Sequence, residues 1–142
     1  MKLSISEEPA TSLAEYARVS IGFEVSRVLD VTVRDGGLGG LSLVERTLTS
    51  PYVKDYDAIE GESPADWASR FDLSNWAFFA AHLGTRRVGG AVVAFDTPEL
   101  FMLEGRRDLA VVWDLRVSPD SRAQGIGEAL FGRVEAWAIE KG

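Results

Sequence analysis

The residues best suited to chemistry in this sequence lie in a short segment near its end. An apolar stretch, Leu115 to Val117, is followed by a loop that contains Gly125 and Gly127, and then by a helical pattern. A helix N-terminus has unpaired N–H groups and a partial positive charge, so it favours a phosphate. Glycine has no Cβ, which lets an anion approach the backbone closely. The segment therefore predicts a phosphate or pyrophosphate site between a strand and a helix.

The spacing of the two glycines distinguishes this loop from common nucleotide-binding motifs. Position 130 is leucine, so the Gly-x-Gly-x-x-Gly fingerprint is incomplete, and the lysine of a Walker loop is missing. Two other patterns are present: Arg-x-x-Gly-x-Gly at residues 122–127, and Leu-x-Val-x-Pro-x-x-Arg at residues 115–122. The alternative interpretation is an ordinary strand–glycine–helix corner, in which the glycines serve tight packing and Arg122 is a solvated surface residue.

Together, these two patterns resemble the signature of the GCN5-related N-acetyltransferase (GNAT) family. A predicted hairpin at residues 76–95 lies where that family has its second and third strands, and the strong resemblance covers residues 76–142. It implies a mixed α/β fold (α+β mixed sheet) of the acyl-CoA N-acyltransferase type. It also implies acetyl-CoA as co-substrate and direct transfer of the acetyl group to a deprotonated amine, without a metal.

The resemblance further implies which residues hold acetyl-CoA. The backbone of the strand pairs with the pantetheine arm, and a main-chain N–H on this strand stabilises the oxyanion that develops. Main-chain N–H groups of the loop and first helical turn hold the pyrophosphate, with an arginine adding a cation beside them. The residues concerned are Leu115, Arg116, Val117, Arg122, Ala123, Gln124, Gly125, Ile126, Gly127 and Glu128.

Asp114 is the candidate catalytic residue, because a strand that follows the family's course places it in or near the cleft. It would relay a proton or bind the substrate ammonium. The alternative is a structural acid paired with an arginine such as Arg116. Trp113 stands where relatives often carry glutamate, so no base is assigned by resemblance. Glu24 and Glu45 are weaker candidates for the acceptor side.

The remaining polar and aromatic residues have two interpretations each. His82 is expected to be an ordinary strand residue, and the alternative is a catalytic role. Tyr52, Tyr56, Trp67 and Trp76 would either wall a substrate pocket or belong to the core.

Composition limits the function further. The chain has 142 residues, 46% of them hydrophobic, which predicts one globular domain over residues 1–142. A net charge of -7 argues against nucleic acid or a membrane as partner and is compatible with a cationic small-molecule amine. The sequence has no cysteine and one histidine, which excludes a disulfide framework and a multi-histidine metal site. It has no apolar leader, so a cytoplasmic location is expected.

Alternation and turn signals predict the elements that position these residues. Strands are predicted over residues 2–6, 23–33, 41–47, 76–83, 88–95 and 109–117, and helices over residues 13–19, 64–71 and 125–141. The glycines at residues 36–40 predict a hairpin turn, and residues 49–61 an irregular segment. In the strand at 109–117, alternation assigns Val111, Trp113, Leu115 and Val117 to one face and Val112, Asp114 and Arg116 to the other.

The sequence stops after the predicted last helix, where the family continues with further strands and a helix. We therefore expect the strand at 109–117 to keep an exposed edge, covered in a homo-oligomer or by a partner chain. The alternative functions are a non-catalytic acetyl-CoA-binding protein, or a remnant that needs a partner chain, and an interaction module that uses the fold alone. The segment Phe23-Glu24-Val25, with the long insertion after it, is similar to streptothricin acetyltransferases.

Overall fold

A computed structural model describes residues 1–142, and the contacts divide the chain into two compact units. The first, which we call the sheet unit, comprises residues 1–21 and 56–142. The second, which we call the hairpin, comprises residues 22–55. None of the helices is both long and apolar enough to cross a lipid bilayer.

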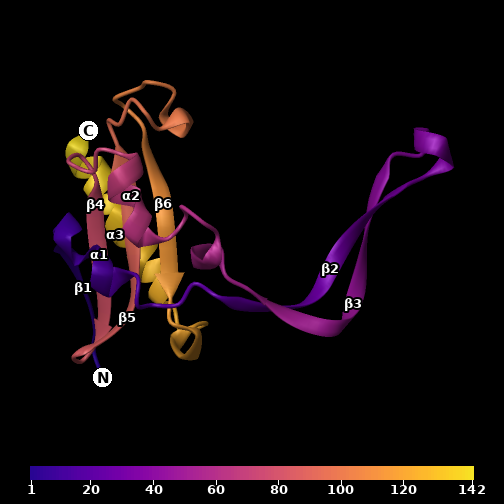
Figure 1. The fold of residues 1–142 in the computed structure, drawn as a ribbon, viewed down its shortest axis with the longest axis horizontal. Coiled ribbons are helices and arrows are strands. Elements are labelled where there is room, and N and C mark those ends of the chain that lie inside the picture. The colour runs from indigo at the N-terminus through magenta and orange to yellow at the C-terminus, as the bar shows by residue number, and fades with distance from the viewer. The chain divides into compact units, whose positions relative to one another are not determined.

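The sheet unit is built on four antiparallel strands. They are β1 (Leu3–Glu8), β4 (Ala77–Leu83), β5 (Arg86–Phe95) and β6 (Ala110–Val117), and their order across the sheet is β1-β4-β5-β6 (Figure 1). The two central strands are buried on both faces, as their near-continuous apolar sequences require. In this order, the strand β6 lies at one edge of the sheet and pairs only with β5.

Helices cover both faces of this sheet (Figure 1). On one face lies α3 (Ile126–Lys141), whose buried stripe packs against β5 and β6. On the other lie α1 (Leu13–Tyr16) and α2 (Pro64–Arg70), with a second, more aromatic core. The residues of the α3 stripe are those expected from its spacing: Ile126, Leu130, Val134 and Trp137.

Short turns and caps connect these elements. Ser63 caps α2 through the Ala65 N–H, and Pro64 occupies the first helical turn, as predicted. The helix α1 ends at Tyr16, three residues earlier than expected, and the Ser12 side chain makes no cap hydrogen bond. Five 3-10 helices complete the chain: Ala10–Ser12, Asp35–Gly37, Tyr56–Ala58, Phe101–Leu103 and Pro119–Ser121.

A β-bulge in β6 changes which residues face which side. Asp114 lies opposite Val92 and Val112 lies opposite Val93, so Trp113 is an extra residue without a cross-strand partner. The expected alternation is therefore wrong at this point. Val112 lies with Leu115 and Val117 on the α3 side, whereas Trp113 packs in the core on the opposite face.

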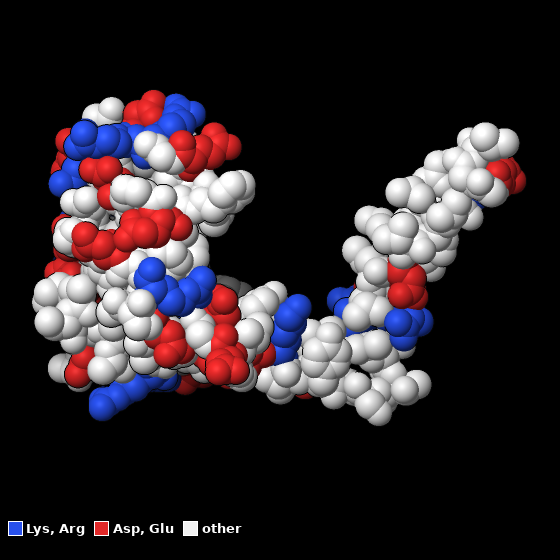
Figure 2. Space-filling model, turned by 45° about the horizontal axis from the view of Figure 1, so that its top comes forward, with Lys and Arg blue, Asp and Glu red and all other residues white.

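The hairpin consists of β2 (Phe23–Val33) and β3 (Leu41–Lys54), joined through a glycine-rich turn. The strand β2 has the predicted bounds. The strand β3 is longer than expected, because pairing resumes at Tyr52 after an irregularity that contains Pro51. Val31 faces Leu43 and Val33 faces Leu41 across the strands, and all four side chains are at least 60% exposed. The hairpin is accordingly mostly white in Figure 2, where charged residues are coloured.

Candidate functional site

The loop between β6 and α3 leaves the first amides of α3 without a side-chain cap. Gly125 is the N-cap residue and has a φ of 83°, a left-handed conformation that favours glycine. Ala123 also has a positive φ, so the loop turns sharply before the helix begins. Residues 123–125 and Glu128 are exposed. The amides expected to hold the pyrophosphate therefore belong to a largely exposed segment without a side-chain cap, which is what an anion site requires.

The two glycines of the loop leave different amounts of room. A Cβ at Gly125 would meet no atom within 4 Å, although its φ disfavours any other residue. A Cβ at Gly127 would meet Leu115 Cδ2 at 3.6 Å, an ordinary contact. Packing within the chain therefore does not require glycine at position 127. This observation weakens the interpretation that both glycines serve packing alone.

Arg122 lies at the other end of this loop, with its guanidinium turned toward backbone carbonyls. Its Nε donates to the Val117 carbonyl at 2.8 Å and its Nη2 to the Ser20 carbonyl at 3.3 Å. These bonds fix the end of β6 against the loop. A contact from Arg122 to a pyrophosphate stays a prediction.

The backbone of residues 115–117 lies in the edge strand β6. In an edge strand, alternate N–H and C=O groups point away from the neighbouring strand and are available to another chain or ligand. The bulge at Trp113 adds further unpaired backbone next to this edge. The strand therefore offers the main-chain groups that pairing with a pantetheine arm requires. The Arg116 side chain is fully buried, so only its backbone is available for this purpose.

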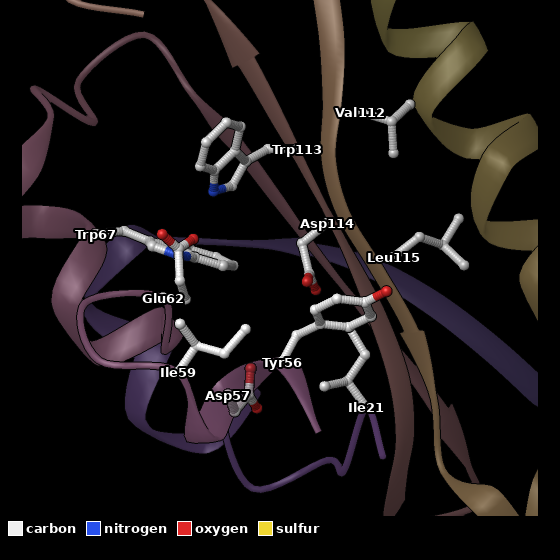
Figure 3. A pocket seen from close by; sticks show the side chains of 10 residues that line it. All are labelled: Ile21, Tyr56, Asp57, Ile59, Glu62, Trp67, Val112, Trp113, Asp114 and Leu115. Atoms are coloured by element: carbon white, nitrogen blue, oxygen red, sulfur yellow. The ribbon is translucent and has the colours of Figure 1, made fainter. Parts of the chain in front are cut away.

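A cavity of about 560 Å³ lies beside β6 on the side of α1 and α2 (Figure 3). The bulge sends two consecutive side chains, Trp113 and Asp114, toward it, while Val112 and Leu115 point toward α3. Trp113 is held by aromatic contacts to Trp67, Phe71 and Trp76. The cavity is lined by Ile21, Tyr56, Asp57, Ile59, Glu62, Trp67, Val112, Trp113, Asp114 and Leu115.

Asp114 belongs to a hydrogen-bonded network centred on Arg116. Arg116 Nε donates to Asp114 Oδ2 at 2.9 Å, and Nη2 donates to Oδ1 at 3.1 Å. The same guanidinium donates to both oxygens of Asp57, at 2.7 Å and 3.0 Å. Its remaining donor reaches the Val19 carbonyl at 3.0 Å. Asp114 therefore pairs with Arg116, which was the alternative interpretation of this residue. Neither this pairing nor its position assigns Asp114 a catalytic step.

Tyr16 completes the network from α1. Its hydroxyl donates to Asp114 Oδ2, and the Arg116 guanidinium lies 5.0 Å from the centre of its ring. Burial, followed by the negative charge of Asp114, raises the pKa of the Tyr16 hydroxyl well above its ordinary value. Gly90 of β5 makes room for this ring, because a Cβ there would collide with Tyr16 and with the Phe79 carbonyl.

The other sequence candidates are dispersed. Tyr56 and Trp67 line the cavity, whereas Trp76 is a core residue whose indole N–H donates to Thr97 Oγ1 at 2.7 Å. His82 is a strand residue opposite Ser4. The hairpin holds the rest: Glu24, Tyr52, and Glu45, which pairs with Arg27 at 3.0 Å.

Sequence reasoning missed Tyr16, Asp57 and Glu62 as site residues. Asp57 is 59 positions from Arg116 and Tyr16 is 98 positions from Asp114. No local pattern connects residues so far apart. The only available signal was the coincidence of several acidic and aromatic residues in the irregular segment before α2, which does not specify direction or partner.

Comparison with known proteins decides the family. The model of the acetyltransferase (GNAT) family matches residues 42–142, more than half of the chain. The chain belongs to the GNAT family. This membership confirms the resemblance and the mixed α/β fold, and it identifies the chain as an acetyl-CoA-dependent N-acetyltransferase. No curated protein sequence matches this GNAT acetyltransferase.

Solved structures share its fold at low sequence identity. A nourseothricin acetyltransferase superposes with a TM-score of 0.66 and 20% identity, covering 100% of this chain and 69% of that chain. A structure from Bacillus anthracis str. Ames, assigned as a streptothricin acetyltransferase and in complex with acetyl coenzyme A, gives 0.62 and 18%, covering 99% and 70%. An aminoglycoside acetyltransferase from an uncultured soil metagenomic sample gives 0.50 and 17%, covering 99% and 72%. At these sequence identities, the similarity to the solved structures shows only that this GNAT acetyltransferase shares their fold.

Proposed function

We propose that this protein transfers the acetyl group of acetyl-CoA to a primary amine of a small-molecule acceptor in the cytoplasm. The observation that carries the proposal is the arrangement around β6. Uncapped amides of α3 follow one end of the strand, and the cavity with Asp114 lies beside its middle. The strand thus lies between a site for a pyrophosphate and a site for an acceptor.

In this proposal, main-chain groups of residues 115–117 hold the pantetheine arm, and residues 122–128 hold the pyrophosphate. Acetyl-CoA supplies an activated acetyl group when bound. The amides at the start of α3 provide donors and a favourable dipole for the phosphates. Asp114 and its neighbours lie where an amine approaching β6 would enter.

A substitution at Gly127 tests the cofactor site. Gly127→Val adds bulk in the first turn of α3, next to Leu115 and Val117 of β6 and to the amides that this proposal gives to the pyrophosphate, and its backbone has no positive φ. We expect calorimetry to show at least about a tenfold loss of acetyl-CoA affinity, the scale of one lost charge-assisted hydrogen bond. Gly132→Val is the matched control, because it lies on the same helix with open space around it. If neither variant changed the affinity for acetyl-CoA, the pyrophosphate would not bind at the start of α3.

Release of CoA in the presence of an amine tests the reaction. Nourseothricin, streptothricin and an aminoglycoside are the first acceptors to screen, because the solved structures with this fold include acetyltransferases of those names. Polyamines and peptide N-termini complete the panel. Turnover with any of them supports the proposal. Binding of acetyl-CoA without turnover of the whole panel would instead support a non-catalytic acetyl-CoA-binding protein.

We also propose that the protein is a homo-oligomer. Two features support this: β6 is an edge strand, and the hairpin exposes apolar residues on paired positions of both its strands. Such surfaces are usually covered by another chain. Sedimentation that finds only a monomer across a wide concentration range would contradict self-association.

A further inference from the structure

The cavity beside β6 has a chemical character that goes beyond accepting an amine. Three of its ten lining residues are acidic, namely Asp57, Glu62 and Asp114, and none is Lys, Arg or His. Asp57 and Glu62 come from the segment between β3 and α2 and Asp114 comes from β6, and Trp67 and Trp113 provide aromatic surface beside them (Figure 3). An aromatic face beside carboxylates is a favourable environment for an organic cation.

The arginine beneath the cavity does not make it a site for an anion. A guanidinium has five N–H donors, and those of Arg116 are all used: one by the Val19 carbonyl, two by Asp57 and two by Asp114. The Arg116 side chain is also 0% exposed. Its effect is to fix Asp57 and Asp114 in place. The two aspartates together still carry one more negative charge than the arginine neutralises.

These carboxylates are poorly suited to surround the amine that reacts. Acetyl transfer forms an N–C bond and breaks the thioester C–S bond, so the nitrogen must lose a proton and CoA leaves as the thiol. A nearby negative charge favours the protonated form of an amine, which is not nucleophilic. Asp57, Glu62 and Asp114 together carry more negative charge than Arg116 and Arg70 neutralise, so they would oppose the reaction if they surrounded the reacting nitrogen. They are better suited to a second positive charge on the same acceptor.

We infer that the cavity binds a second amine of the acceptor, one that stays protonated while the first amine reacts. The substrate class is therefore a small molecule with at least two cationic groups. Asp57, Glu62 and Asp114 contact that charge, and Trp67 and Trp113 pack beside it. Arg116 is a positioning residue that holds two of the carboxylates. The inference rests on the proposed function for the reaction, but binding of the charge does not require turnover.

Calorimetric titration of the full chain with 1,4-diaminobutane and 1-aminobutane tests the inference without acetyl-CoA. The two amines have the same carbon chain and differ by one ammonium group. We expect at least about tenfold tighter binding of the diamine, the scale of one charged hydrogen bond. Equal affinity for the two amines, or no saturable binding of the diamine, would overturn the inference.

Variants then assign the preference to residues. Glu62→Gln changes an exposed side chain at the edge of the cavity, where Glu62 also pairs with Arg70 at 3.3 Å, and should reduce the preference for the diamine to about threefold or less. Glu135→Gln, on the exposed side of α3, is the control and should leave it unchanged. Arg116→Lys keeps the positive charge but loses the fork that holds both aspartates, and should lower the affinity for the diamine more than the affinity for 1-aminobutane. A diamine preference that survives in both Glu62→Gln and Asp57→Asn would overturn the assignment.

The same variants distinguish this inference from the proposed function. Where turnover occurs, the carboxylate variants should raise KM for the diamine with little change in kcat, since they remove binding of a group that does not react. A diamine preference without any CoA release would leave the inference standing and reject the proposed reaction. Turnover with equal kcat/KM for both amines would support the proposed reaction and reject the inference.

Discussion

The sheet unit and the hairpin both contain antiparallel strand pairs with apolar residues, but the surroundings of these residues are opposite. In β4 and β5, Val92, Val93 and Phe79 are completely buried. In β2 and β3, Val31 and Leu43 face each other across the strands yet are 62% and 65% exposed. The sequence of β2 alternates as expected of a strand with one apolar face, whereas the sequences of β4 and β5 are near-continuously apolar. Both patterns predict a strand, and burial follows where helices of the same unit cover it.

The difference has an energetic consequence. An isolated two-stranded hairpin is marginally stable in water, while a sheet covered on both faces gains from burial of apolar surface. All four tryptophans, at positions 67, 76, 113 and 137, lie in the sheet unit. Tryptophan fluorescence during urea unfolding therefore reports on that unit, and matched substitutions in the two regions compare them directly.

The largest difference is expected between two arginines that each pair with aspartate. Arg116→Met removes a fully buried guanidinium and leaves Asp57 and Asp114 without their partner. Breaking a buried ion pair in this way costs about 3–5 kcal/mol of unfolding free energy. Arg46→Met removes an exposed pair with Asp30 in the hairpin and should leave the urea midpoint unchanged. Equal shifts in the two variants would contradict the contrast.

The next difference concerns two valines of the paired strands. Val92→Ala deletes two methyl groups from a completely buried site and should lower the unfolding free energy by about 2 kcal/mol. Val31→Ala deletes the same groups from a side chain that is 62% exposed within one chain, and no change in the urea midpoint is expected at concentrations where the protein is monomeric. A loss of similar size for Val31→Ala in the monomer would contradict this contrast, whereas a loss that appears only at higher concentration would support the proposed self-association.

The smallest effect is a pH dependence that belongs to Tyr16. Burial and Asp114 raise its pKa in the folded state, so the folded state binds the hydroxyl proton more tightly than the unfolded state does. The resulting stabilisation is complete below pH 10, the ordinary tyrosine value, and is lost as the pH rises above it. Tyr16→Phe should cost about 1.5 kcal/mol at pH 8 and make the decline of stability above pH 10 shallower.

Tyr52→Phe is the matched control in the hairpin, where the side chain is 51% exposed. Its unfolding free energy should follow the wild-type protein at every pH. If Tyr16→Phe instead declined as steeply as wild type above pH 10, the hydroxyl of Tyr16 would not be the group responsible.

Much of the fold was predictable from local patterns. The bounds of β2 and the stripe of α3 follow from alternation and helical spacing, and the structure confirms both. The errors arise where the pattern is interrupted. Pro51 made the end of β3 resemble a loop, and one extra residue at Trp113 reversed the predicted faces before it. A bulge has no distinct sequence signal when the inserted residue is itself a good strand former.

The candidate site was predictable only where it is continuous in sequence. The loop at residues 122–127 has glycines whose chemistry can be reasoned from position alone, although its contact with pyrophosphate stays a prediction. In the network around Arg116, the pairing with Asp114 was foreseen as an alternative, whereas the contributions of Tyr16 and Asp57 could not be predicted. They depend on tertiary packing that brings together residues up to 98 positions apart, and on Gly90 leaving space for a ring from α1.

The bulge makes Trp113 a supernumerary residue of β6. Every other residue of the strand keeps the facing that a regular strand would give it if position 113 were removed. An aromatic wall can therefore be added to or deleted from the cavity by one codon, without redistributing the side chains that pack on α3. Under the proposed function, the cavity is thus a place where acceptor specificity can diversify while the sheet stays as it is.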